Sequence, residues 1–323
     1  DFDGTPVSLF SAVMTLYTSA AVAPSVMTVP LPIAFSELTA PLLYPVYHWV
    51  RPYRAHAFEV ALYAEDPTEN PDAEPIDTMT TQLSEIYDQK PRITQGFFYW
   101  RVRSLDEAGE SASGWSPVLK FRNDPKDNWE IAVFGDSISH GGGHISYGPA
   151  DHEFSWLSYL DFPAINLSMS GDTSETMLER FEADVLPFHP RYLLILNGTN
   201  SLRAGVSAAE VIADLEELKA RCLANGIRPI FLTLPPINPE NIARAFDEPT
   251  ADDWQTQFSL VNAFLRTEVH IDVAAAFSTH PLLPTELALD GLHEDVIGKQ
   301  LIAQTVNRAW PETKQQADRL PAQ

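Results

Sequence analysis

Four short polar motifs hold the residue types that nucleophilic catalysis at a carbonyl requires. They are GDSIS at 135–139, SGD at 170–172, NGTN at 197–200 and DGLH at 290–293. A serine alcohol becomes a nucleophile only when a histidine takes its proton, and a carboxylate must orient that imidazole. Asp290 and His293 lie three positions apart and can supply both groups from one loop, with Ser137 as the serine.

The same motifs offer donors for a negatively charged intermediate, which needs N–H groups aimed at its oxygen. The backbone N–H groups of Ser137 and Gly171 and the side-chain amide of Asn200 would serve. Taken singly, each of these residues is more simply a turn or capping group, and GES at 109–111 repeats the G-x-S form in an unrelated turn. All four motifs in order favour a hydrolase.

The elements that must position these motifs alternate between strands and helices from residue 128 onward. Apolar runs predict buried parallel strands at 130–135, 164–168, 191–198, 228–236 and 269–273. Helical periodicity lies between them, at 153–160, 174–186, 207–226, 252–267 and 294–310. This order predicts a parallel sheet covered on both faces, with the active site beyond the carboxyl ends of the strands.

In these four motifs the chain resembles the SGNH (GDSL) hydrolase family over roughly residues 128–310. The resemblance implies a three-layer α/β/α, flavodoxin-like fold, an ester hydrolase activity and no cofactor or metal. It assigns Ser137 as nucleophile, His293 as base and Asp290 as its partner, with Gly171 and Asn200 joining Ser137 in the oxyanion hole.

Two positions depart from the family pattern. Ile138 replaces the leucine of GDSL, which is a harmless exchange between apolar residues. Ser201 replaces the usual aspartate after Asn200, which raises the question of how firmly that asparagine is held.

The first 123 residues have the pattern of an antiparallel β-sandwich. Short runs rich in β-branched and aromatic residues alternate with turns, and the only hint of a helical period lies at 77–88. Residues 35–123 resemble a fibronectin type III domain in YPVYHWV (44–50), EVALY (59–63) and the stretch 98–121. We therefore expect a β-sandwich over 1–123, acting as a spacer or docking module, and a catalytic domain over 128–323.

The charge balance restricts the partners. The 323 residues carry 44 acidic and 21 basic side chains, a formal net charge of −23, and no cluster of Lys or Arg. Such a surface repels nucleic acids and anionic membranes. The single cysteine, Cys222, lies in a helical pattern and excludes an internal disulfide framework. The oligomeric state stays open.

Other candidate groups carry less weight. His140, His144 and His152 could suggest a metal site, but no supporting carboxylate pattern accompanies them, and a flexible glycine-rich rim beside Ser137 is the preferred interpretation. Trp156 and Trp254 could stack on a sugar ring, although both lie in helical patterns typical of core residues.

The long segment 235–253 is a candidate substrate-binding loop. Residues 4–36 carry no charge, but prolines interrupt them and no run reaches the length of a membrane span. We interpret them as extended structure near the start of a mature or trimmed chain. Ala21–Ala23 resembles a signal cleavage site, yet Asp1 and Asp3 stand where a leader carries basic residues.

A β-sandwich joined to this catalytic domain is similar to carbohydrate-active architectures, so the sequence favours a carbohydrate O-acetyl esterase, extracellular or periplasmic, acting on a small ester or an acetylated glycan. Two alternatives remain open at this point. One is a lipase- or thioesterase-type acyl hydrolase, and the other is a catalytically silent protein that binds glycans or other surfaces.

Overall fold

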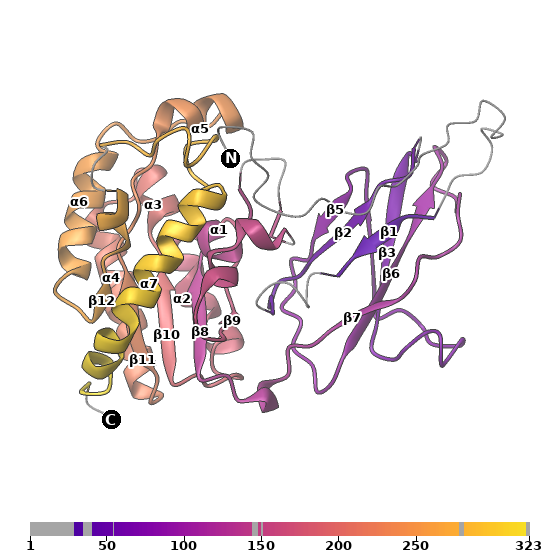
Figure 1. The fold of residues 1–323 in the computed structure, drawn as a ribbon, viewed down its shortest axis with the longest axis horizontal. Helices are drawn as coiled ribbons and strands as arrows, with labels where there is room; N and C mark the ends of the chain where they lie inside the picture. The colour runs from indigo at the N-terminus through magenta and orange to yellow at the C-terminus, as the bar shows by residue number, and fades with distance from the viewer. Residues whose placement is uncertain are drawn as a thin grey trace, which may run out of the picture.

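The chain forms an N-terminal β region and a C-terminal α/β region (Figure 1). The computed structural model describes residues 29–34, 41–53, 55–143, 148–149, 151–277 and 281–320. Most of the segment expected to be extended at 4–36 lies outside the described residues. The described end of that segment, 29–34, includes the short strand β1 (Leu31–Ile33).

Two antiparallel sheets build the N-terminal region. The first has the order β1-β2-β5 and the second the order β4-β3-β6-β7. The strands are β2 (Val46–Val50), β3 (Ala57–Tyr63), β4 (Asp77–Thr81), β5 (Glu85–Tyr87), β6 (Phe98–Leu105) and β7 (Leu119–Phe121). The alternating residues Phe58, Val60 and Leu62 of β3 share one buried cluster with Tyr47 and Trp49 of β2. The two sheets therefore enclose a common core, as the alternation predicts.

The helical interpretation of residues 77–88 is wrong. This stretch forms two strands, β4 and β5, which belong to different sheets. Three threonines in the first half, at 78, 80 and 81, favour the extended conformation because their branched Cβ restricts the side-chain rotamers of a helix. The strand β5 pairs with β2, so that Tyr87 lies opposite Val46.

A five-stranded parallel sheet forms the centre of the C-terminal region, in the order β12-β11-β10-β8-β9. Its strands are β8 (Ile131–Gly135), β9 (Ile165–Asn166), β10 (Tyr192–Leu196), β11 (Arg228–Leu232) and β12 (His270–Ile271). Every residue of β8 and β10 is buried. Continuous apolar runs of this kind are typical of strands covered on both faces.

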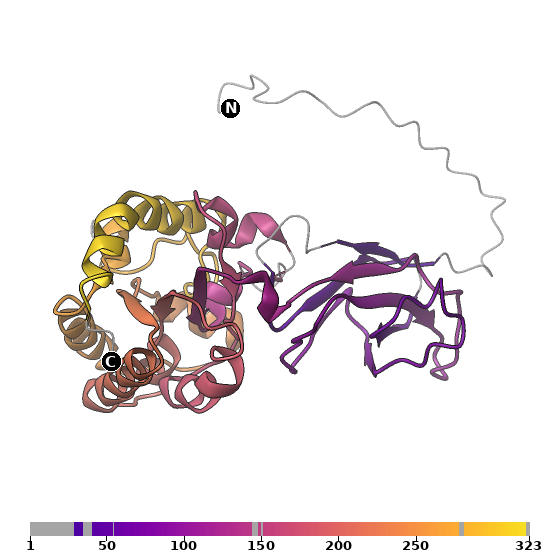
Figure 2. The same ribbon diagram turned by 90° about the horizontal axis from the view of Figure 1, so that it is seen from below.

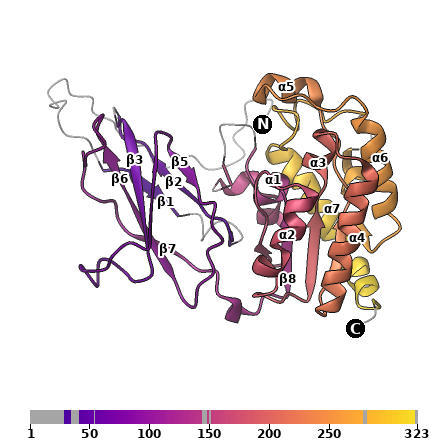
Figure 3. The ribbon, with the colours of Figure 1, turned by 180° about the vertical axis from the view of Figure 1, so that it is seen from behind.

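Helices cover both faces of this sheet. The helices α2 (Ser174–Asp184), α4 (Ala208–Ala224) and α6 (Trp254–Leu265) lie on one face, and α7 (Val296–Ala317) lies on the other (Figures 2 and 3). The Ser207–Glu210 capping box starts α4 as predicted, and Cys222 packs in its buried face. Within the described part of the chain, no helix has the length and apolar character needed to cross a membrane.

The predicted helix at 153–160 is replaced by two short 3-10 helices, His152–Phe154 and Trp156–Tyr159. Ser155 between them is extended (φ −109°, ψ 120°), which breaks the helical path. Trp156 is fully buried in the core. Packing of this side chain has overridden the local helical pattern.

The two regions are joined by backbone pairing as well as by the chain. Residues 41–43 run parallel to β9, where Leu43 N–H donates to Asn166 O (2.9 Å) and Asn166 N–H donates to Pro41 O (2.9 Å). Leu43 and Tyr44 belong to the core of the α/β region. A 3-10 helix at Pro125–Asp127 lies where the chain passes from the β region back into β8.

Candidate active site

Ser137 lies two residues after the end of β8, as the first residue of the short helix α1 (Ser137–His140). Asp136 caps this helix by accepting a hydrogen bond from Ile138 N–H (3.0 Å). A Cβ at Gly135 would meet Leu196 O at 2.7 Å, so only glycine allows β8 to turn this close to β10. The strand end and the cap together place Ser137 at the carboxyl edge of the sheet.

The structure brings Ser137, His293 and Asp290 into one hydrogen-bonded chain. Ser137 Oγ donates to His293 Nε2 at 2.8 Å, and His293 Nδ1 lies 2.8 Å from Asp290 Oδ2. The carboxylate can only accept, so Nδ1 carries the proton and Nε2 is free to accept from the serine. The arrangement matches the geometry that a serine nucleophile and its base require.

The loop that carries Asp290 and His293 is held rigidly. Asp290 Oδ1 accepts from the backbone N–H groups of Leu292 and His293, both at 2.8 Å. Burial opposes ionisation of this carboxyl, but the hydrogen bonds from His293 and Leu292 outweigh it and hold the pKa of Asp290 below its ordinary value. A Cβ at Gly291 would meet Asn238 O at 2.4 Å, so the loop packs tightly on the segment that begins α5 (Pro239–Phe246).

The predicted oxyanion donors line the same pocket as Ser137. Gly171 has a left-handed φ of +91°, a conformation that glycine adopts without strain. Asn200, in the short helix α3 (Thr199–Arg203), donates from Nδ2 to Asp172 O at 2.9 Å, and its Oδ1 accepts from Arg203 at 3.4 Å. Opposite partners on the two sides fix the orientation of the amide and leave one Nδ2–H for a ligand.

Ser201 does not take part in holding Asn200. Its buried Oγ accepts from the N–H of Ser174 (2.9 Å) at the start of α2. The hydroxyl of Ser174 in turn donates to Asp214 (2.6 Å). Asn200 is instead positioned by Asp172 and Arg203. These two contacts hold the asparagine although position 201 lacks the usual aspartate.

Arg180 connects the ends of the strands beneath the loop that carries Gly171. It donates to Asp172 (2.7 Å) and to Leu167 O (2.7 Å), and its guanidinium lies 4.2 Å from the centre of the Phe134 ring. Asp172 directly follows Gly171, so this contact ties the loop to α2. The sequence analysis missed Arg180, although its spacing of eight residues from Asp172 is a weak signal of the contact.

A group of buried ionisable side chains lies beneath α1. Lys299 donates to Ile138 O at 2.8 Å and lies 3.5 Å from Glu294, and both side chains are inaccessible to solvent. Burial raises the pKa of Glu294 and lowers the pKa of Lys299. Burial likewise raises the pKa of Asp136 to about 7. Among the described residues the Asp136 side chain accepts only from Ile138 N–H, so its observed contact is that of a helix cap.

His140 uses both ring nitrogens within the protein. Nε2 donates to Tyr44 O at 2.7 Å, and Nδ1 accepts from the hydroxyl (2.8 Å) and the N–H of Ser170. Burial lowers the pKa of His140 to about 4, which keeps the ring neutral. In the described part of the chain no three His, Cys, Asp or Glu side chains come together as metal ligands would. His144 lies outside the described residues.

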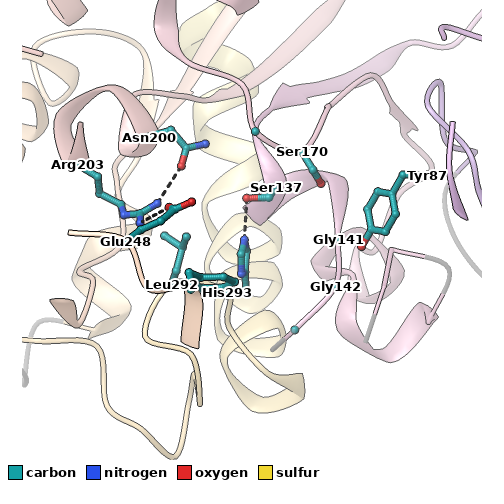
Figure 4. A pocket seen from close by; sticks show the side chains of 13 residues that line it. Tyr87, Ser137, Gly141, Gly142, Ser170, Asn200, Arg203, Glu248, Leu292 and His293 are labelled. Atoms are coloured by element: carbon teal, nitrogen blue, oxygen red, sulfur yellow. Dashed lines mark hydrogen bonds and ion pairs between the residues drawn. The ribbon is translucent and has the colours of Figure 1, made fainter. Parts of the chain in front are cut away.

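Ser137 and His293 line a pocket of about 340 Å³ (Figure 4). Tyr87 from β5 lines one side of it, while Phe246 and Glu248 line it from the end of α5 and the segment that follows. The Phe246 ring lies edge-on to His293, with ring centres 5.8 Å apart. The volume suits a small ligand. The predicted loop 235–253 thus contains a helix and contributes to the pocket.

Several pocket residues were not expected from the sequence. Tyr87 lies in the other region of the chain, and no local pattern connects it with Ser137. Arg203 stands three positions after Asn200 and could have been noticed by that spacing. Trp156 and Trp254 are buried in the core, as their helical patterns favoured, and do not line the pocket.

The parallel sheet, the pocket at its carboxyl edge and the hydrogen-bonded serine define an α/β protein of the hydrolase class. Comparison with protein families gives a match to the GDSL-like Lipase/Acylhydrolase family over residues 133–301. This match covers more than half of the chain, and the chain belongs to that family. It is therefore an ester hydrolase.

Individual relatives are distant. An uncharacterized lipoprotein, YqeF, from Bacillus subtilis is 28% identical over 120 residues, which cover 33% of this chain and 49% of the relative. The match thus spans about half the length of that relative. Among solved structures, an alpha/beta hydrolase enzyme from the metagenome of Lake Arreo has 22% identity and a TM-score of 0.45, covering 56% of this chain and 94% of that one. A lipase/acylhydrolase from Enterococcus faecalis has 22% identity and a TM-score of 0.43, covering 60% and 97%.

Proposed function

We propose that the chain is a serine esterase that cleaves carboxylic esters through an acyl-enzyme, with acetylated carbohydrates as its substrates. Ser137 is the nucleophile, His293 the general base and Asp290 its partner. The observation that carries this assignment is the unbroken chain of 2.8 Å contacts from Ser137 Oγ through the His293 ring to Asp290.

The reaction follows from the positions of these groups. Ser137 Oγ attacks the ester carbonyl carbon while His293 Nε2 takes the hydroxyl proton, and the Asp290 carboxylate stabilises the resulting imidazolium. The N–H groups of Ser137 and Gly171 and the free Nδ2–H of Asn200 donate to the oxyanion. The intermediate collapses, the alcohol leaves with the proton from His293, and a water repeats the sequence on the acyl-enzyme.

The pocket supports a small acyl group and a polar alcohol. Its volume of about 340 Å³ is near the lower end for small-molecule sites. The aromatic rings of Tyr87 and Phe246 offer faces for a sugar, and the hydroxyl of Tyr87 and the carboxylate of Glu248 offer hydrogen bonds. These features favour acetylated glycans over long acyl chains.

The test is hydrolysis of para-nitrophenyl acetate, butyrate and octanoate by the wild type and by Ser137→Ala. We expect acetate turnover that is lost in Ser137→Ala. Ser111→Ala is the matched control, because Ser111 lies in the same G-x-S form within the β region, and this variant should keep full activity. Turnover retained by Ser137→Ala would overturn the mechanism. Strong octanoate turnover would indicate that the substrate is a lipid ester rather than an acetylated glycan.

We also propose the division into a β-sandwich of the fibronectin type III kind (1–123) and a catalytic domain (128–323). Two separate hydrophobic clusters support it, one within each range apart from Leu43 and Tyr44. We likewise propose an extracellular or periplasmic location, because one relative is a lipoprotein.

A further inference from the structure

Arg203 is a cation in the pocket wall with poorly filled hydrogen-bonding capacity. Its side chain is only 9% exposed, yet its two side-chain contacts, to Asn200 Oδ1 and to Glu248 Oε2, are both 3.4 Å long. Hydrogen bonds between charged groups are ordinarily about 2.7–2.9 Å. The buried Nε–H finds no acceptor among the described residues.

Two other arginines with the same degree of burial show what full pairing looks like in this chain. Arg180, with a side chain 11% exposed, makes contacts of 2.7 Å to Asp172 and 2.8 Å to Asp184. Arg92, with a side chain 10% exposed, contacts Asp88 at 2.6 Å and Asp77 at 2.5 Å. Neither of them lines the pocket. Only Arg203, among these three, lacks a close carboxylate.

Glu248 is a weak partner for Arg203. Its side chain is 65% exposed and lies in the segment that follows α5. An exposed carboxylate at this distance gains little from the ion pair because water competes for both groups. A carboxylate brought by a ligand can therefore join or replace Glu248 at small cost. Figure 4 shows Arg203 and Glu248 on one side of the pocket, with Ser137 and His293 beside them.

We propose that Arg203 makes this side of the pocket a binding site for a carboxylate of the substrate, so that the enzyme prefers esters that carry one negative charge. The planar guanidinium matches a carboxylate with two parallel hydrogen bonds. One charge is favoured over many, because the formal net charge of −23 repels polyanions at encounter. This inference rests on the proposed esterase function and narrows its substrate class.

Two pairs of esters test the site. They distinguish a carboxylate on the acyl group of the substrate from one on its alcohol. The acyl pair is para-nitrophenyl hemisuccinate and its neutral methyl ester. The alcohol pair is 4-acetoxybenzoate and its methyl ester. For each pair the readout is the ratio of kcat/KM, charged over neutral, at constant ionic strength, and each variant is compared with the wild type so that intrinsic reactivities cancel.

Arg203→Gln should lower this ratio by about tenfold or more in at least one pair, since it removes a charged hydrogen-bond donor from the ligand. Arg203 also positions Asn200, but loss of that role slows both esters of a pair alike and leaves the ratio unchanged. Arg203→Lys keeps the positive charge but cannot donate two parallel hydrogen bonds to one carboxylate. Its ratio should therefore fall between those of the wild type and Arg203→Gln.

Glu248→Gln should shift the ratio in the opposite direction, upward by several-fold, because it removes the competing carboxylate. This variant changes an exposed side chain and tests the site even where Arg203→Gln does not fold. Arg244→Gln is the matched control: Arg244 is exposed on α5 and pairs with Glu240, so the same loss of charge should leave the ratio unchanged.

Ratios that stay at the wild-type value in both pairs for Arg203→Gln and Glu248→Gln would overturn the carboxylate site. A rise in Arg203→Gln or a fall in Glu248→Gln would do the same. Failure of the proposed function looks different: the neutral esters would then be hydrolysed equally by the wild type and Ser137→Ala, or by neither.

Discussion

The two segments that meet at the active site, 136–140 and 290–293, each bury a carboxylate next to a residue of the proposed triad. Asp136 is 1% exposed and Asp290 is 2% exposed. Their surroundings have opposite effects. Asp290 accepts two backbone N–H groups and the His293 ring, and its pKa lies below the ordinary value. For Asp136 burial dominates and raises the pKa to about 7.

Burial opposes ionisation of both carboxyls, and the hydrogen bonds that offset it differ between them. Asp136 accepts from Ile138 N–H, while its Oδ2 finds no donor among the residues that the structure describes. The nearby carboxylates of Asp172 and Glu294 oppose its ionisation further. Burial alone therefore does not keep a carboxylate ionised, as it must be to stabilise a protonated histidine. The loop must also supply donors that keep it charged.

The largest effect should come from His293→Ala, which removes the proposed base from the segment 290–293. We expect kcat for para-nitrophenyl acetate to fall by about 10⁶, the cost of deleting the histidine in comparable triads. Circular dichroism should show an unchanged fold, because the ring is only partly buried. Activity within tenfold of the wild type would exclude His293 as the base.

The next largest effect should separate the two carboxylates. Asp290→Asn should lower kcat by about 10³–10⁴, because an amide offers His293 a donor in place of a carboxylate and fails to stabilise the imidazolium. Asp136→Asn, its matched control, keeps the cap and should change kcat by less than about tenfold. Equal losses in steady-state kinetics would show that the two carboxylates share one role.

The short helix α3, which follows β10, should give an intermediate effect. Asn200→Ala removes one oxyanion donor and should lower kcat by about 10²–10³ with little change in KM. Asn200→Asp, which replaces the donor by a negative charge, should be at least as impaired. Separate measurement of kcat and KM checks this, and a loss confined to KM would mean that Asn200 only binds substrate.

The smallest effect concerns stability. Because the native pKa of Asp136, about 7, lies above the ordinary 3.8, the folded state holds a proton that the unfolded state releases between these values. Asp136 thus lowers stability as the pH rises through this window. Asp136→Asn removes the dependence, so from about pH 5.5 to about pH 8 the variant should gain about 2 kcal/mol relative to the wild type. Urea unfolding at both pH values measures the gain, and a constant difference would contradict it.

Much of the fold was accessible from the sequence because the strands are continuous apolar runs. The residues of β8 and β10, buried on both faces, could hardly be interpreted otherwise. The secondary structure was predicted wrongly where tertiary packing, rather than the local sequence pattern, determines it. Residues 153–160 have a helical pattern, but burial of Trp156 divides them into two 3-10 helices. Residues 77–88 are split between two sheets, which no local pattern indicates.

The residues at the centre of the site could be predicted from the sequence, whereas the residues that line the rest of the pocket could not. Ser137, Gly171 and Asn200 each lie close behind a strand, so the sheet itself brings them together. Their catalytic roles remain predictions. Tyr87 reaches the pocket only because β5 pairs with β2 in the other region. The long contact between Arg203 and Glu248 likewise depends on the position of Glu248 in the segment after α5.

The pairing of residues 41–43 with β9 has a consequence for how the chain can be divided. A shorter chain that starts after residue 123 would keep every residue of the proposed triad. It would also turn β9 into an open sheet edge, with the N–H and C=O of Asn166 unpaired. His140 would lose Tyr44 O, the acceptor of its Nε2–H. The separated α/β region would thus offer an unpaired edge for strand addition, and we expect it to self-associate.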